Sequence, residues 1–179
     1  MLASRLQDFR RARPVSAVLS LARWLAANLP WSESLRASPY WFAGVLTLHV
    51  VFAAVVAGLV VMMDLRLAGA GHLRTSAAAM HGRLFPWFAG AFALAVLTGT
   101  AMVWTDPLRY YGKTFFWWKM GLVGVAGLNA GCLQLASRRE GFRWEGGAAR
   151  AAGIASLLLW AGVVALGRLT AYEWFTAEY

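Results

Sequence analysis

Residues 40–63 of this chain form a predominantly apolar run of 24 residues with no charged side chain. A helix of about 20 such residues crosses the ~30 Å hydrocarbon core of a bilayer, where only helices and closed barrels satisfy their own backbone hydrogen bonds. Three more apolar runs follow, at about 84–105, 115–136 and 148–169. The sequence therefore predicts an all-α integral membrane protein, built as a bundle of four transmembrane helices.

The segments outside these runs are too short to form a second domain. We expect one membrane domain of residues 40–172, preceded by a basic tail of residues 1–13 and followed by a short tail of residues 173–179. Between the basic tail and the first span, residues 14–39 are predicted to form an amphipathic helix in the membrane interface, followed by a linker. Apolar residues recur there at helical spacing, but Arg23 interrupts a run that is already too brief to span.

The charge of the chain is strongly basic, at +9, and its arginines lie mostly in the tail and the loops. Such residues contact anionic lipid headgroups, and no basic run is interleaved with aromatics along a soluble face. The lipid bilayer is therefore the expected partner, and nucleic acid is not.

The loops are short, so neighbouring spans should be antiparallel. We call the side that holds the N-terminus side A, and the side that holds the 64–83 and 137–147 loops side B. Arginines near span ends favour side B as the cytoplasmic side.

His49 lies inside the first predicted span. A titratable group in hydrocarbon is costly, so it is a functional-site hypothesis by default. Two interpretations stay open at this point. His49 could be a metal or cofactor ligand, or it could be a neutral imidazole that bonds a threonine hydroxyl or a backbone carbonyl of a neighbouring helix.

Haem b is one cofactor that His49 could bind, and it usually needs two axial ligands at similar depth. At 1.5 Å per residue, His49 lies ~13 Å from the side A end of its span. His72 and His81 are expected on side B, before the second span, which removes them as partners within one chain. The remaining second ligands are Met120, at ~8 Å from the side A end, His49 of a second copy in a homodimer, or a residue of a larger membrane complex.

A polar site without haem is the other possibility. Lys119, Thr98 and Arg168 are predicted in the same half of the membrane as His49. An imidazole, a hydroxyl and two cations could bind a quinone headgroup or a small anion, or relay protons. Lys119 and Arg168 also have a simpler interpretation, since long cationic side chains near a span end extend to the interface.

The other polar residues near the spans are predicted to be structural. Asp64 and Arg66 are expected to anchor the side B end of the first span, with Asp64 paired to Arg83, so that no acidic residue lies deep in a span. Asn129 is expected to bridge helices by hydrogen bonding. The sequence contains no nucleophile–base pair, phosphate loop or zinc motif, so no residue is assigned a catalytic role.

Several motifs together resemble a family of uncharacterised bacterial inner-membrane proteins, a domain of unknown function. The resemblance covers about residues 24–135, and its most specific part is His49 followed by an Asp-Leu-Arg-Leu exit at residues 64–67. It also includes Pro86-Trp87, Gly90, Thr98-Gly99, Lys119 and the Gly-Leu-Asn-Ala of residues 127–130. The resemblance implies four or five helices in a bacterial inner membrane. At the level of fold alone it is distantly similar to helical b-type cytochromes and copper-resistance membrane proteins.

These features lead to a ranked set of functional hypotheses. The first is a redox-associated membrane subunit that binds haem b or a quinone near His49 and serves a respiratory or electron-transfer partner. The second is a non-enzymatic membrane scaffold or assembly subunit, in which His49, Lys119 and Asn129 fix helix packing. A small-solute or proton conduit is third, because an intramembrane carboxylate is not expected.

Overall fold

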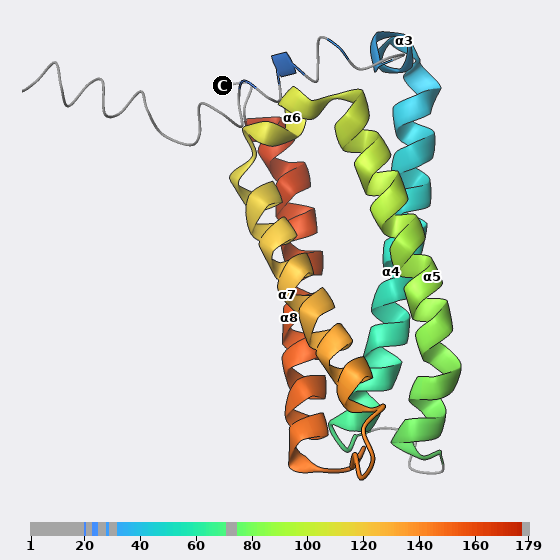
Figure 1. Cartoon of the computed structure of the whole chain (residues 1–179). Helices are drawn as coiled ribbons and strands as arrows, with labels where there is room; N and C mark the ends of the chain where they lie inside the picture. The colour runs from blue at the N-terminus through green and yellow to red at the C-terminus, as the bar shows by residue number, and fades with distance from the viewer. Residues whose placement is uncertain (1–19, 21–22, 25–27, 29–31, 71–74, 177–179) are drawn as a thin grey trace, which may run out of the picture.

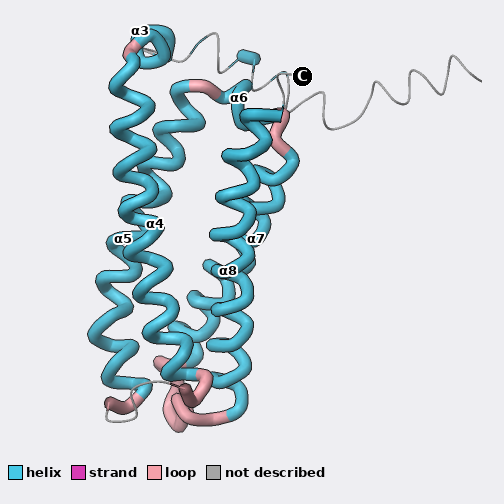
Figure 2. The backbone as a smooth tube through the Cα atoms, turned by 180° about the vertical axis from the view of Figure 1, so that it is seen from behind, coloured by secondary structure: helices cyan, strands magenta, loops and turns pink. Residues whose placement is uncertain are grey.

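The computed structural model of the chain describes residues 20, 23–24, 28, 32–70 and 75–176. Within these residues the chain forms α3 (Ser32–Ala37), α4 (Pro39–Leu67), α5 (Ala77–Thr105), α6 (Pro107–Tyr111), α7 (Thr114–Ala136) and α8 (Gly147–Thr176). The described residues contain no strand (Figure 2), which confirms the predicted all-α fold. The basic tail, most of the predicted interface helix, His72 and residues 177–179 lie outside the described residues.

Four long helices form two antiparallel hairpins, α4 with α5 and α7 with α8 (Figure 1). The short helix α6 connects the hairpins at the end where α3 also lies, which is side A (Figure 1). The hairpins pack against each other through α4 and α8. The alternating direction of the helices agrees with the short loops of the sequence.

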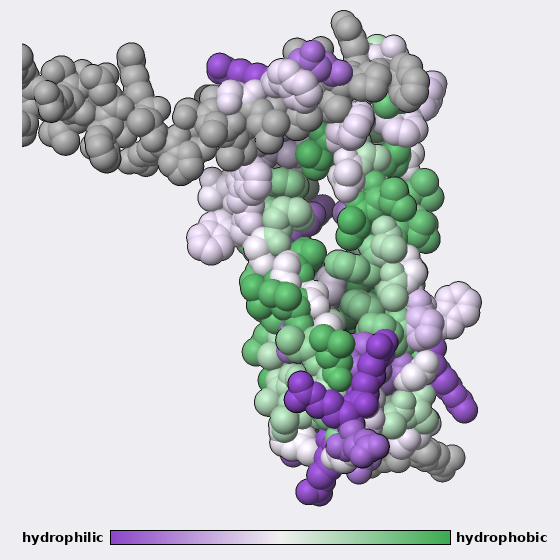
Figure 3. Space-filling model, viewed as in Figure 1, coloured by the Kyte–Doolittle hydropathy of each residue, from purple (hydrophilic) through white to green (hydrophobic). Residues whose placement is uncertain are grey.

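Three helices are long and apolar enough to cross a membrane: Tyr40–Leu67, Ala77–Thr105 and Gly147–Tyr172. The chain is therefore a membrane protein by the length and composition of its helices, and hydrophobic residues cover the middle of the visible face (Figure 3). Helix α7 has 23 residues and is not among the three. Its Lys119, Asn129 and Gln134 lower its hydropathy, so a fourth span is not established by composition.

Helix α5 begins earlier than predicted, at Ala77 rather than near residue 84. The hydroxyl of Ser76 accepts a hydrogen bond from the backbone N–H of Ala79 at 3.2 Å, which caps the helix. One expectation was wrong as a result, because His81 lies within α5 rather than before it. The earlier start also places Pro86 in the interior of the helix.

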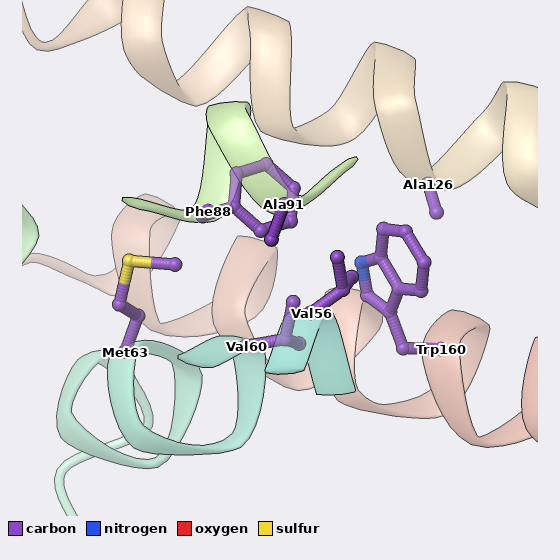
Figure 4. Close-up of a cluster of buried hydrophobic side chains, with 7 residues drawn as sticks. All are labelled: Val56, Val60, Met63, Phe88, Ala91, Ala126 and Trp160. Atoms are coloured by element: carbon purple, nitrogen blue, oxygen red, sulfur yellow. The ribbon is translucent and has the colours of Figure 1, made fainter. Parts of the chain in front are cut away.

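The central core joins all four long helices (Figure 4). Its buried residues are Val56, Val60, Met63, Phe88, Ala91, Ala126 and Trp160. The indole of Trp160 meets the rings of Phe88 and Phe92 edge-on, with ring centroids 6.1 and 5.8 Å apart. Such edge-to-face pairs stabilise packing beyond the apolar area that they bury.

The two ends of the bundle are packed differently. At side B, a second cluster of Leu67, Ala77, Leu133 and Ala149 again draws one residue from each long helix. At side A, the buried cluster is Val45, Met102 and Tyr110, from α4, α5 and α6. Helix α7 adds only the partly buried Phe116 there, and α8 adds no residue to this cluster. The hairpins are thus held together in the middle and at side B.

Helices α4 and α8 come into close contact at Gly153. A Cβ atom at this position would lie 2.7 Å from the Cβ of Leu67 and 3.1 Å from the carbonyl oxygen of Asp64. Only glycine leaves room for such an approach of two helix backbones. The contact brings the last turns of α4 against the part of α8 that carries Ser156.

Candidate functional site

His49 projects from α4 onto the backbone of α5. Its Nδ1 lies 3.0 Å from the carbonyl oxygen of Ala95 and 3.1 Å from the hydroxyl of Thr98. Gly99 leaves space for the ring, since a Cβ there would lie 3.1 Å from Cε1 of His49. These are the two kinds of contact that the structural interpretation of this histidine expects.

The contacts of Nδ1 determine which ring nitrogen of His49 is available. A carbonyl oxygen can only accept, so Nδ1 carries the proton and donates to Ala95. The hydroxyl of Thr98 donates to the carbonyl of Leu94 at 2.8 Å, which leaves its lone pairs for the imidazole. In the neutral ring, Nε2 is then unprotonated, and it has no hydrogen bond within the described residues. An imidazole held in this way through Nδ1 presents Nε2 to a ligand.

Lys119 approaches His49 from the other hairpin. It lies in α7, close enough to act electrostatically on the imidazole. Its aliphatic stem packs near α8, with Cδ 3.8 Å from where a Cβ of Gly167 would be. Lys119 is partly buried, and among the described side chains it has no ion pair or hydrogen bond. The structure therefore groups His49, Thr98 and Lys119.

Met120 and Arg168 lie apart from this group. Met120 is 38% exposed, and Arg168 is exposed with its guanidinium carbon 5.0 Å from the ring centroid of Tyr172 in its own helix. Such a cation–π contact at a helix end accounts for the arginine without a ligand. In the described part of the chain, no hydrogen bond or ring contact joins either residue to His49.

The side B end of α4 differs from its prediction. Asp64 is only 6% exposed, whereas its expected partner Arg83 is exposed. The arginine that pairs there is Arg66, which donates to Glu145 at 3.0 Å and to the carbonyl of Thr75 at 2.7 Å. Asp64 instead turns into the bundle, where it and Ser156 of α8 line the same cavity. The expected pair of Asp64 with Arg83 is therefore wrong, whereas Asp64 does lie in the last turn of α4, as predicted.

His81 lies inside the bundle on α5, the other helix of the hairpin that contains Asp64, and is 8% exposed. Its Nε2 lies 2.9 Å from Oε1 of Gln134 in α7, and its ring packs against Phe85 and Trp144 with centroids 5.0 and 4.8 Å away. Since the amide oxygen accepts, Nε2 donates, and Nδ1 of the neutral ring is an acceptor. No hydrogen bond to Nδ1 is formed by any described residue.

Asp64 and His81 line one small cavity between the four long helices. The cavity has a volume of about 20 Å³, and Asn129, Ser156 and Trp160 also line it. Asn129 donates to the carbonyl of Ala152 at 3.2 Å, which confirms that it bridges α7 and α8. Oδ2 of Asp64, Nδ1 of His81 and Nε1 of Trp160 are all buried without a hydrogen-bond partner in the described structure.

The sequence contained a signal for this second site that the prediction did not use. Asp64, His81, Asn129 and Ser156 each interrupt an apolar helix on its side B half. Counting depth from side B would have placed them together, as it placed His49 with Lys119. The described residues contain no group of three His, Cys, Asp or Glu side chains arranged to hold a metal ion.

Comparison with protein-family models, with curated proteins and with solved structures finds no match to this chain. The resemblance to the uncharacterised inner-membrane family therefore stays a prediction.

Proposed function

We propose that the chain is a redox-associated membrane subunit that binds a quinone headgroup between its two hairpins, at His49 and Lys119. The observation that supports this most is the free Nε2 of His49, which is left as an acceptor because Nδ1 donates to Ala95. Lys119 comes from the opposite hairpin and supplies a cationic donor nearby. In Figure 3 the surface is hollowed between the hairpins in the half nearest α6.

The chemistry of a quinone suits this pair. A quinol hydroxyl donates a hydrogen bond to Nε2 of His49, and the ammonium group of Lys119 donates to a headgroup oxygen. When the quinol is oxidised, its two electrons pass to a redox centre of an electron-transfer partner. One hydroxyl proton passes to Nε2, and the resulting imidazolium is stabilised by the carbonyl of Ala95. The proton of the second hydroxyl group is released to water at side A.

Haem b fits this site less well. A second axial ligand is needed near Nε2 of His49, and the other described histidine, His81, lies at the opposite end of the bundle. Met120 is exposed and makes no bond to His49 in the described structure. A haem would therefore need His49 of a second copy or a ligand from a partner subunit.

The proposal includes a location. We propose that the chain is a multi-pass protein of the bacterial inner membrane, the location that the family resemblance implies. A lipid-soluble quinone dissolves in the bilayer and can reach a site between the helices from there. We propose that α7 is the fourth span, because it runs antiparallel to α5 and α8, which are long and apolar enough to span, and its polar residues face partners in the bundle, as Asn129 does. Side B is proposed to be cytoplasmic.

Quinone binding can be tested directly in nanodiscs with a short-chain ubiquinone analogue as the probe. His49→Ala and Lys119→Met should each weaken binding by about tenfold, equivalent to ~1.4 kcal/mol. Thr47→Ala is the matched control, because Thr47 is exposed on the same helix and its hydroxyl bonds only the carbonyl of Ala43. Binding that both variants leave unchanged would contradict the proposal. A Soret band that the unmodified protein shows and His49→Ala lacks would indicate that the ligand at His49 is haem and not a quinone.

The scaffold hypothesis has one specific observation in its favour, the bonds from His49 to Ala95 and Thr98 that join α4 to α5. If His49 serves only to join α4 to α5, His49→Asn should preserve partner capture and stability, and the quinone analogue should not bind to the unmodified protein. Saturable binding that depends on His49 would exclude a role in scaffolding alone.

A further inference from the structure

We propose that Asp64 and His81 form a proton-binding site, in which one buried water molecule links the two side chains and is held by Trp160. This site is separate from the proposed quinone site. Asp64 follows His49 by 15 residues of the same helix, which is ~22 Å of rise. The inference rests on the cavity and its hydrogen bonding, and it holds whether or not a quinone binds at side A.

The hydrogen-bonding groups around the cavity fit one water molecule. The two acceptors without partners are Oδ2 of Asp64 and Nδ1 of His81, and the donor without a partner is Nε1–H of Trp160. A water molecule can donate two hydrogen bonds and accept two. It can therefore accept from Nε1–H of Trp160 and from whichever of the two side chains carries a proton, and donate to the other, so that it satisfies all three atoms. The volume of about 20 Å³ is enough for one water.

Burial makes these three atoms unusual. Asp64, His81 and Trp160 are 6, 8 and 7% exposed, respectively. Figure 4 shows the indole nitrogen of Trp160 on the edge of the ring that faces the buried cluster. An unmet buried hydrogen-bonding group costs about 1–3 kcal/mol. Three of them around one cavity therefore indicate a bound polar molecule that the side chains are arranged to receive.

The charges nearby leave the carboxyl group of Asp64 without a cationic partner. From α4, Arg66 is committed to Glu145 and to the carbonyl of Thr75. From α8, Arg150 donates to the carbonyl of Ala68 at 2.7 Å. Helix α7 contributes only neutral amides to the cavity region, through Asn129 and Gln134. A lone buried carboxylate is unfavourable, so the pair with His81 is expected to hold one proton.

The proton can move without changing the net charge of the site. In one form Asp64 is a neutral carboxylic acid and His81 a neutral imidazole. The Asp64 proton passes to the water oxygen as the water gives another of its protons to Nδ1 of His81, and the products are a carboxylate and an imidazolium. The water is regenerated, and no oxidant or reductant is needed. A second proton, taken up from side B, would leave both groups protonated.

A monovalent cation is the other small ligand that an aspartate, an asparagine and a serine could attract. The N–H of Trp160 opposes it, because an indole offers a cation a positive edge and no lone pair. Water and a proton are thus favoured by the observations, and the cation is an outcome that the experiment can detect.

The test is pH-difference infrared spectroscopy of the purified protein in nanodiscs, from about pH 4 to about pH 9. We expect a protonated-carboxyl C=O band that titrates, shifts on transfer to D2O and is absent in Asp64→Asn. Glu140→Gln is the matched control, since Glu140 is exposed in the 137–147 loop. It should leave the band in place. The measurement on the unmodified protein stands even if a variant does not fold.

Two further variants separate a shared proton from a merely buried acid. His81→Gln should move the midpoint of the Asp64 band by at least about one pH unit, and Trp160→Phe should shift the band frequency because the water loses its donor. A carboxyl band that ignores both changes overturns the shared site. The proposal also fails if no band depends on Asp64, or if sodium ions abolish the titration, which would indicate a cation site.

Discussion

The two halves of the bundle differ in how closely the helices enclose their polar side chains. In the side B half, four helices close around Asp64 and His81, and their polar atoms can be satisfied only inside a cavity of about 20 Å³. In the side A half, the buried cluster lacks α8, and both Nε2 of His49 and the ammonium group of Lys119 are without hydrogen bonds in the described structure. A closed site selects a molecule of the size of water, whereas an open one can admit a headgroup.

This difference follows from the small residues that the helices present to each other. Gly153 lets α8 approach α4 at side B, and Ala126 is fully buried in the centre of the bundle. At side A, Gly99 instead leaves space for the ring of His49 to pack against α5, within one hairpin. Glycines thus join the hairpins at one end and support a side chain at the other.

The strongest way to break the comparison is to remove the side chain that closes the central core. Trp160→Ala should lower the free energy of unfolding by about 4 kcal/mol, because its buried indole packs edge-on against both Phe88 and Phe92. Thermal unfolding in detergent would measure this. Trp118→Ala is the control, since Trp118 is 67% exposed and should change stability little. Equal losses in the two variants would show that the core does not hold the hairpins together.

The side A cluster can be tested through pH. Burial, assisted by the Asp106 carboxylate and opposed by Arg109, raises the pKa of Tyr110 from 10.0 to about 12. The neutral, buried phenol of Tyr110 contributes fully to the free energy of unfolding below pH 10. This contribution is lost as the pH rises towards about 12, because the unfolded chain releases its phenolic proton first. Tyr110→Phe should remove up to about 3 kcal/mol of this alkaline loss. Alkaline unfolding curves identical to those of the unmodified protein would be inconsistent with a closed cluster around α6.

The loops at side B should depend on Arg66. Arg66→Ala removes its bonds to Thr75 and Glu145 and should cost about 1.5 kcal/mol. Glu145→Gln should cost less than about 1 kcal/mol, because the Glu145 side chain is 70% exposed and the solvent screens the pair. Chemical denaturation compares the two. A larger effect of the glutamate variant would mean that the ion pair, and not the bond to the carbonyl of Thr75, holds this end.

The smallest effect is expected inside the α4–α5 hairpin. Thr98→Val removes the hydroxyl near Nδ1 of His49 but leaves the bond to Ala95, so stability should fall by only about 0.6 kcal/mol. Thr100→Val, on an exposed position of the same helix, is the control for the change to valine. A loss above about 2 kcal/mol would show that the threonine, and not the carbonyl, fixes the imidazole.

Local patterns were enough to predict the four long helices and their directions, but not the short helices α3 and α6. Residues 40–63 lie within α4, and short loops led to the antiparallel hairpins. The start of α5 was missed because the cap depends on the hydroxyl of Ser76 bonding to Ala79, a contact that hydropathy does not register. The same seven-residue error placed His81 outside the helix. Its contact with Gln134 and its place beside Asp64 in the cavity were therefore not predicted.

The His49 region was predicted in part. Depth along antiparallel helices brought Thr98 and Lys119 to His49, because rise per residue is constant. Depth could not tell which face of a helix a side chain occupies, so Arg168 was grouped with them although it turns to Tyr172. Rotation about the helix axis is decided by packing between helices.

The sequence alone determined that this chain is helical and apolar enough to enter a membrane, because hydrocarbon accepts only backbones that satisfy themselves. It also placed His49 in the first of those helices. Only the tertiary structure decided that Asp64 turns inward, to the cavity that Ser156 also lines, rather than outward to Arg83. That choice depends on the close approach of α4 to α8 at Gly153, a contact between segments more than eighty residues apart.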